Sequence, residues 1–268
     1  MRRLVLLTNF AHLWLMKMCK WLTFQLHGPM ASWGDIAVGT IRPSWNHPTR
    51  SAIIGLLSAA LGIRRDDEEM LLRISQGYRM AFRVVDSGSL IRDYHTIHST
   101  KPRSKKQARV YHTRKDALES LDNEIETTLS SRDYLCDSYY IVFMTESDTP
   151  PFSLEELEKY LREPVFTLYL GRKSCPLALP LNPLIIEAET LEDVCKSYSL
   201  DSVCKSYFLD SKLKKRTSPK FQIFWEEGIK AGDGVRELQS EFRRDQLVSR
   251  KRWQYSDRKE HRGFVEGG

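Results

Sequence analysis

Alternating apolar positions mark the first clear element of this sequence. Leu22, Phe24 and Leu26 are separated by residues of a different character. A period of two is typical of a half-buried strand, so we predict a strand over residues 21–27. The glycine–proline pair at 28–29 then ends it.

The next periodic stretch has helical spacing. Its apolar face consists of Ile53, Leu56, Leu57, Ala60 and Leu61. Pro48 suits the first turn of this predicted helix, and Gly62 suits its end. The small residues Gly55, Ser58 and Ala59 keep the other face thin, so another molecule can approach it closely.

Later apolar runs complete a recognisable order of elements. The sequence predicts a short helix at Met70–Ser75 and strands at Arg79–Val85, Ser138–Met144 and Phe166–Leu170. Ser153 and Glu156 form a capping box before another helix, which Pro164 ends. The order strand–helix–strand–strand–helix–strand predicts an α+β, ferredoxin-like domain, a fold that RNA-recognition sheets also use. Many functions use this fold, so the fold alone decides none of them.

No core periodicity continues between about residues 91 and 132. Segments this long inside a compact domain are usually functional or disordered, and we predict an arm inserted into the domain. The arm contains seven basic residues and no acidic one between Ser99 and Lys115. They are Lys101, Arg103, Lys105, Lys106, Arg109, Arg114 and Lys115.

The basic charge of the chain is concentrated in this arm. The whole chain has 41 Lys and Arg against 35 Asp and Glu, and removing those seven leaves 34 against 35. A local excess of this kind favours a polyanionic partner at a defined place. The alternative is a solvated loop that happens to be basic.

Two further segments could hold phosphates. Thr49, Arg50 and Ser51 stand at the predicted helix start, where free N–H groups, hydroxyls and a cation form an anion site. The alternative there is an ordinary capped helix packed on a sheet. The run Gly171–Ser174 places a glycine and two cations at the end of a predicted strand.

Proline residues at 176, 180 and 183 mark a predicted boundary between two parts of the chain. We predict an N-terminal extension over 1–17, the ferredoxin-like domain over 18–180 and a small C-terminal region over 181–268. The basic tail at 241–262 also carries aromatic residues, a combination that can hold phosphates and stack bases. The alternative for this tail is a small strand pair over the sheet.

Cysteine usage and the N-terminus indicate a cytoplasmic protein. The five cysteines are odd in number and none are spaced C-x-x-C, so the sequence supports neither a disulfide framework nor a zinc site. The apolar run within 1–17 is too short to span a bilayer. We therefore expect no membrane association, and no motif of the sequence predicts a cofactor or a metal.

If the protein is an enzyme, the candidate catalytic side chains lie in or near the arm. His95, Tyr94 and Lys101 could supply the base, the acid and the cation of a metal-free ribonuclease, and His98, Tyr111 and His112 lie nearby. Nothing in the sequence fixes the relative positions of these groups.

Five strings, in this order, carry a resemblance to a known family. They are 26–34, 48–67, 90–96, 132–137 and 169–177. Together they resemble the CasD (Cas-five) family of subunits in the type I-E CRISPR Cascade complex, over roughly residues 20–180. The tail around Arg250 is similar but more weakly, and residues 1–17 do not match.

The resemblance implies a noncatalytic subunit with a RAMP-type, ferredoxin-like domain. In this family the domain binds the 5′ handle of the CRISPR RNA and caps the backbone filament. A thumb-like arm reaches over the guide against the backbone subunit CasC, with the large subunit CasA and the target DNA also in the complex. Type I-C relatives cut repeat RNA without a metal, which is the alternative function.

The resemblance also implies which residues contact the RNA. These are Thr49, Arg50, Ser51, Arg92, Tyr94, His95, Lys101, Arg103, Lys105, Lys106, Arg109, Gly171, Arg172, Lys173, Ser174 and Arg250.

Overall fold

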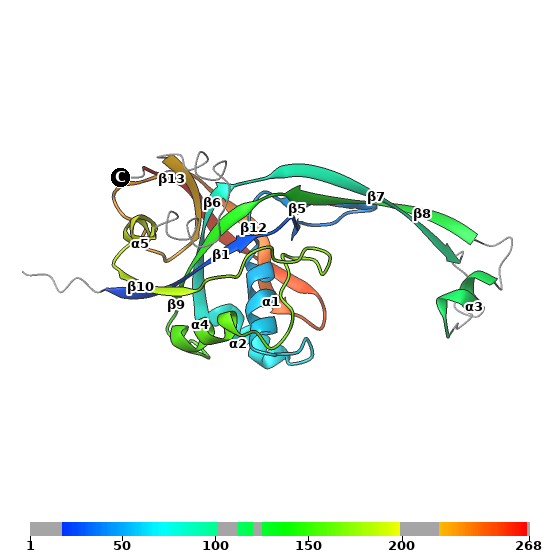
Figure 1. The fold of residues 1–268 in the computed structure, drawn as a ribbon, viewed down its shortest axis with the longest axis horizontal. Coiled ribbons are helices and arrows are strands. Elements are labelled where there is room, and N and C mark those ends of the chain that lie inside the picture. Colours follow the sequence, from blue (N-terminus) through cyan, green and yellow to red (C-terminus); the bar gives the residue numbers. More distant parts are fainter. Residues whose placement is uncertain (1–17, 101–111, 120–124, 199–219, 267–268) are drawn as a thin grey trace, which may run out of the picture.

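The computed structural model describes residues 18–100, 112–119, 125–198 and 220–266 (Figure 1). It is a mixed α/β structure in which antiparallel strands predominate and helices are few. Among the helices that it describes, none is long and apolar enough to cross a membrane.

The main sheet has seven strands, in the order β10-β1-β9-β6-β11-β13-β12, with antiparallel neighbours throughout. They are β1 Cys19–His27, β6 Tyr78–Asp86, β9 Tyr139–Glu146, β10 Leu184–Ala188, β11 Lys220–Glu226, β12 Val235–Ser249 and β13 Gln254–Glu266. Strands from both sides of residue 180, the predicted domain boundary, therefore share one sheet. The basic tail forms the β12–β13 hairpin at one edge of it.

Helices cover both faces of this sheet. The longer ones are α1 Arg50–Ala60, α2 Glu68–Gly77 and α4 Leu154–Arg162, with the shorter α5 Leu191–Ser197. Apolar residues of α1, α2 and α4 join alternate residues of β1, such as Phe24, in one buried cluster. On the opposite face, α5 packs on Trp21 and Phe143 in a second cluster. The predicted strand is confirmed as β1, but the expectation that it is half-buried is wrong. Residues 21–26 are all buried, because both faces of the sheet are covered.

Local signals placed the ends of two helices. Thr49 is the N-cap of α1, so Pro48 lies before the helix and not within its first turn as expected. Gly62 takes a left-handed conformation with φ of 75° just after this helix, as a helix stop requires. At α4, Ser153 and Glu156 form the predicted capping box.

The strand predicted over Phe166–Leu170 is wrong. The segment is a loop, with only an isolated bridge from Tyr169 to Pro176. The N–H groups at the start of this segment donate to the end of α1: Val165 N bonds to Ala60 O (2.9 Å) and Phe166 N to Ala59 O (3.1 Å). β10 takes the place beside β1 instead.

The first and last parts of the predicted arm are the two strands of one long hairpin. β7 Ser89–Thr100 pairs antiparallel with β8 Ile125–Cys136 along their whole length. This hairpin extends far from the body of the protein, with α3 Arg114–Glu119 near its outer end (Figure 1). Short strands hold its base: β2 Met30–Ala31 and β4 Ile41–Arg42 pair with β8, while β3 Trp33–Gly34 pairs with β5 Ser44–Trp45.

Candidate nucleic-acid interface

Residues from four separate segments meet in one groove of about 950 Å³. Its walls are the loop around β4, the start of α1, the turn after residue 170 and the tip of the β12–β13 hairpin. Of the residues predicted to contact RNA, the groove brings together Thr49, Ser51, Gly171, Arg172 and Arg250.

Arginine dominates the charge of this groove. Arg42 and Arg244 line it in addition to the predicted arginines, and both are exposed. The acidic lining residues are Asp35 and Asp245. Asp245 is already paired with Arg258, whose Nε donates to Oδ1 at 2.6 Å, so it offsets little of the groove's positive charge. The groove can therefore accept an anionic chain.

The turn at Gly171 depends on the absence of a side chain. Gly171 has φ of 82°, and a Cβ atom there would clash with the carbonyl oxygen of Ser32. Ser32 is held in place by its own bonds, since its N donates to Leu170 O (3.1 Å) and its Oγ to Asp133 O (3.0 Å). The glycine therefore lets the turn pack directly against the loop at Ser32, which also lines the groove.

We expect Gly171→Ala to destabilise the fold by roughly 1–3 kcal/mol from the backbone conformation alone, with the clash adding to this. Gly39→Ala is the matched control, because Gly39 also has positive φ, 66°, but a Cβ there meets no atom within 4 Å. Urea unfolding measures both. Equal losses for the two variants would show that the contact with Ser32 contributes nothing.

Arg172 connects this turn to the base of the arm. Its guanidinium carbon lies 4.9 Å from the centre of the Tyr134 ring, and its Nη2 donates to Arg42 O at 3.3 Å. The adjacent Asp133 is buried and accepts two bonds from Arg92, at 2.7 and 3.0 Å. The bond from Arg92 holds the pKa of Asp133 below its usual range. Arg92 is thus committed to an ion pair, although its side chain remains 55% exposed.

Tyr94 and His95 lie on opposite faces of β7, since neighbouring residues of a strand point to opposite sides. Tyr94 is 62% exposed, and His95 Nε2 lies 2.5 Å from Asp93 Oδ2. The acid and base proposed for a ribonuclease are therefore not brought together. Lys101, the proposed cation, lies outside the described residues, as do Arg103, Lys105, Lys106 and Arg109.

Lys173 and Ser174 are exposed beyond the Gly171 turn. Lys173 lines a second cavity, which adjoins the groove and shares Ser51, Arg250 and Tyr255 with it. Within the described residues, no three His, Cys, Asp or Glu side chains gather as ligands of a metal would.

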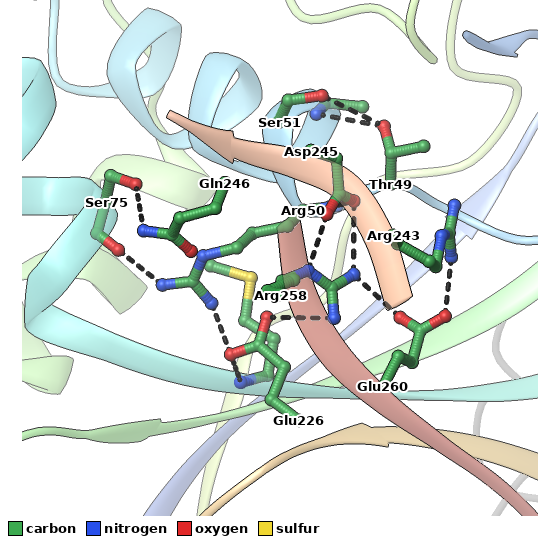
Figure 2. A network of polar contacts seen from close by, with 12 residues as sticks. Thr49, Arg50, Ser51, Ser75, Glu226, Arg243, Asp245, Gln246, Arg258 and Glu260 are labelled. Carbon is green, nitrogen blue, oxygen red and sulfur yellow. Dashed lines mark hydrogen bonds and ion pairs between the residues drawn. The ribbon is translucent and has the colours of Figure 1, made fainter. Parts of the chain in front are cut away.

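The anion site expected at the start of α1 differs from the structure, because the side chain of Arg50 is buried. It is 4% exposed, and its guanidinium pairs with Glu226 (Figure 2). The guanidinium also donates to Tyr78 O at 2.8 Å. Its backbone N donates to Asp245 Oδ2 at 2.8 Å. The anion at this helix start is thus a carboxylate of the chain itself, and Arg50 has a structural role here.

Thr49 is also turned inward. It is 2% exposed, and its Oγ1 accepts a bond from Ala52 N at 3.3 Å, as an N-cap does. Ser51 alone of these three predicted contacts is partly exposed. Its hydroxyl lies 3.3 Å from that of Thr49 and faces the groove.

The buried ion pairs continue from Arg50 to the edge hairpin. Glu260 is 1% exposed and accepts bonds from Arg243 Nη1 and Arg258 Nη2, each at 2.7 Å (Figure 2). Burial alone would raise its pKa, but His47, Arg258 and Arg243 hold the pKa of Glu260 well below its usual range. This network links the β12–β13 hairpin to the start of α1, and both of these elements line the groove.

We expect His47 to make the fold sensitive to mild acid. Burial lowers the pKa of His47 from 6.5 to about 4, so the unfolded chain takes up this proton first as the pH falls. The free energy of unfolding is therefore unaffected by His47 above about pH 6.5. It falls by roughly 3 kcal/mol as the pH decreases from 6.5 to 4. Urea unfolding across this range measures the loss. His47→Gln should lack this part of the pH dependence, and an unchanged slope in the variant would contradict the assignment.

Comparisons with known proteins agree with the resemblance seen in the sequence. A family model described as CRISPR-associated protein (Cas_Cas5) matches residues 21–259. The chain belongs to this family. It is 37% identical over 172 residues to the CRISPR system Cascade subunit CasD of Escherichia coli strain K12. The aligned region covers 61% of this chain and 70% of that protein.

Two solved structures share the fold of this chain. A chain of a CRISPR RNA-guided surveillance complex has a TM-score of 0.56 at 22% identity, covering 92% of this chain and 90% of that one. A crystal structure of a Cas protein has a TM-score of 0.52 at 20% identity, covering 92% and 95%. At these identities the likeness shows the fold alone.

Three residues of the groove were missed by the sequence analysis or left without a role. Arg42 lies in the two-residue strand β4, in a part of the sequence that has no periodicity and no motif. Arg244 and Trp253 lie within the basic, aromatic tail, which was the signal that could have singled them out. Trp253 is 62% exposed with φ of 54°, and the Arg250 guanidinium lies 4.1 Å from its ring centre. An arginine-backed, exposed indole is suited to stacking on a base.

Proposed function

We propose that this chain binds the 5′ handle of a CRISPR RNA as a noncatalytic subunit of a type I-E interference complex. The observation that carries the proposal is the groove in which Ser51, Gly171, Arg172 and Arg250 converge from distant parts of the sequence. Single-stranded RNA is recognised by cations on its phosphates and by stacking on its splayed bases. The arginines and Trp253 supply both kinds of contact. The CasD relative, named as a Cascade subunit, supports the assignment.

We also propose a ferredoxin-like, RAMP-type domain as the RNA-binding unit. Support comes from four strands that stand side by side in the order β10-β1-β9-β6, which is 4-1-3-2 when numbered along the chain. α1 and α4 are the crossover helices between them and contribute to the same buried cluster. The domain would then run from residue 18 to β10, with β11, β12 and β13 as its C-terminal extension.

The arm is proposed to contact the guide and the neighbouring backbone subunit, CasC. Leu90, Tyr94 and Leu129 share one face of the β7–β8 hairpin and are 59%, 62% and 42% exposed. A hairpin with two strands is marginally stable in water by itself, and exposed apolar side chains of this kind indicate a covering partner. In this proposal the chain caps the backbone filament in the cytoplasm. It reaches CasA and the target DNA through the complex.

The proposal is tested by assembling the complex in cells on two guide RNAs. One guide carries the native 5′ handle and the other a scrambled handle with the same spacer. We expect the chain to copurify with the native guide and the other subunits, and to be lost with the scrambled guide. Equal recovery with both would contradict handle binding.

The same purified chain tests the alternative function. Incubation with repeat RNA in the presence of a chelator should leave the RNA intact. Specific cleavage that His95→Ala abolishes would favour the metal-independent endoribonuclease.

A further inference from the structure

A second cavity, of about 510 Å³, lies beside the groove on the outer side of α1. Its floor includes Ile54, Gly55 and Ser58 of the helix, and the loop with Phe166 and Tyr169 closes one side. Leu247 and Tyr255 of the edge hairpin close the other. Since Ser51, Arg250 and Tyr255 also line the groove, the cavity and the groove adjoin each other.

The lining of this cavity combines apolar surface with cations. Ile54 and Leu71 form a buried floor, and Phe166 is 42% exposed at the side. Four basic residues line the cavity, and none of its described lining residues is acidic; they are Arg64, Arg65, Lys173 and Arg250. The side chains of Arg64, Arg65 and Lys173 form no ion pair with another described residue and are exposed. A flat apolar group attached to an anion would satisfy both parts of this lining.

Gly55 keeps the cavity open. It lies in the interior of α1, where glycine weakens a helix relative to alanine. Its φ is not positive, and a Cβ built on it meets no atom within 4 Å. Nothing in the described part of the chain therefore requires glycine at this position. The missing side chain instead leaves room for a molecule that approaches the helix from outside.

We propose that this cavity takes one splayed-out nucleotide of the CRISPR RNA, an inference that rests on the proposed handle binding. The base lies against the apolar floor and Phe166, and the adjoining phosphates lie toward Lys173 and Arg250. Four cations without a carboxylate match a nucleotide, and the volume lies in the range of small-molecule pockets. Because the cavity adjoins the groove, one RNA strand can contact both.

The test fills the cavity without disturbing the fold. Gly55→Leu places a leucine in the open space, and Gln76→Leu adds the same side chain to an exposed position of α2 outside both spaces. Binding of the full-length chain to a handle oligoribonucleotide is measured by fluorescence anisotropy, with each handle nucleotide replaced in turn by an abasic one. We expect Gly55→Leu to weaken binding roughly ten- to hundredfold, the loss of one stacked base, and Gln76→Leu to leave it unchanged.

One abasic position should identify the bound nucleotide. It should weaken binding to the wild-type chain about as much as Gly55→Leu does, and should weaken binding to the variant no further. Melting temperatures check the fold: Gly55→Ala should raise the melting temperature, and Gly55→Leu should not lower it.

The outcomes separate this inference from the function on which it rests. If the wild-type chain binds native and scrambled handles equally, both are overturned. If it prefers the native handle and a folded Gly55→Leu binds that handle equally well, only the nucleotide pocket is overturned. Unchanged RNA binding with loss of another subunit from the complex would assign the cavity to a protein partner, and would also overturn the inference.

Discussion

Glu260→Gln is expected to cost roughly 3–5 kcal/mol of folding free energy, because breaking a buried ion pair leaves uncompensated charge inside the protein. Glu260 is 1% exposed and bridges Arg243 and Arg258. Glutamine keeps the shape of the side chain but removes its charge and turns an N–H₂ group toward two guanidinium groups. Urea unfolding at pH 7 measures the loss.

The control for this prediction is an ion pair on the surface. Lys20 and Glu155 are 2.7 Å apart, but their side chains are 54% and 52% exposed. Exposed pairs contribute little to stability, so Glu155→Gln should leave the unfolding curve almost unchanged. A loss for Glu260→Gln no larger than this would show that the buried network does not hold the hairpin against α1.

The second large effect is expected on RNA binding. Replacing Arg42, Arg172 and Arg250 together by glutamine should weaken handle binding roughly a hundred- to thousandfold, at about tenfold for each charged contact. The plot of log affinity against log salt should also become shallower by about 2, which is about 0.7 for each of three phosphate contacts. Anisotropy titrations over a series of salt concentrations measure both quantities.

Lysine at the same three positions is the matched control. It keeps the positive charge, so the salt dependence should stay close to that of the wild-type chain. Affinity should still fall, because an ammonium group cannot hold a phosphate in two parallel bonds or stack on Trp253 as Arg250 does. An unchanged salt slope in the glutamine variant would place these arginines away from the phosphates.

Elements specified by local sequence were predicted well. The period of two in β1, the N-terminal capping box of α4 and Gly62 after α1 each depend on residues close together in the chain. No strand forms over 166–170, because the backbone N–H groups of residues 165 and 166 donate to carbonyl groups at the end of α1, about a hundred residues earlier in the sequence. The sequences of β7 and β8 show no periodic pattern of apolar residues. Most of this hairpin lies away from the core, so neither of its faces is buried along its whole length.

The same distinction applies to the candidate site. The Gly171 turn was identified from its own residues, and the basic tail indicated the region of Arg250. The role of Arg50 was not predictable locally, because its partner Asp245 lies 195 residues away in the sequence. Only the folded chain brings that carboxylate to the helix start and so removes the expected phosphate site.

Ultraviolet cross-linking of the assembled complex tests the central claim most directly. With photoreactive nucleotides placed only in the 5′ handle, mass spectrometry of the cross-linked peptides reports which segments of this chain touch that RNA. We predict cross-links in the loop around Arg42, in the turn at 171–174 and at the hairpin tip at 250–255. Handle cross-links confined to other segments or to other subunits would contradict the account.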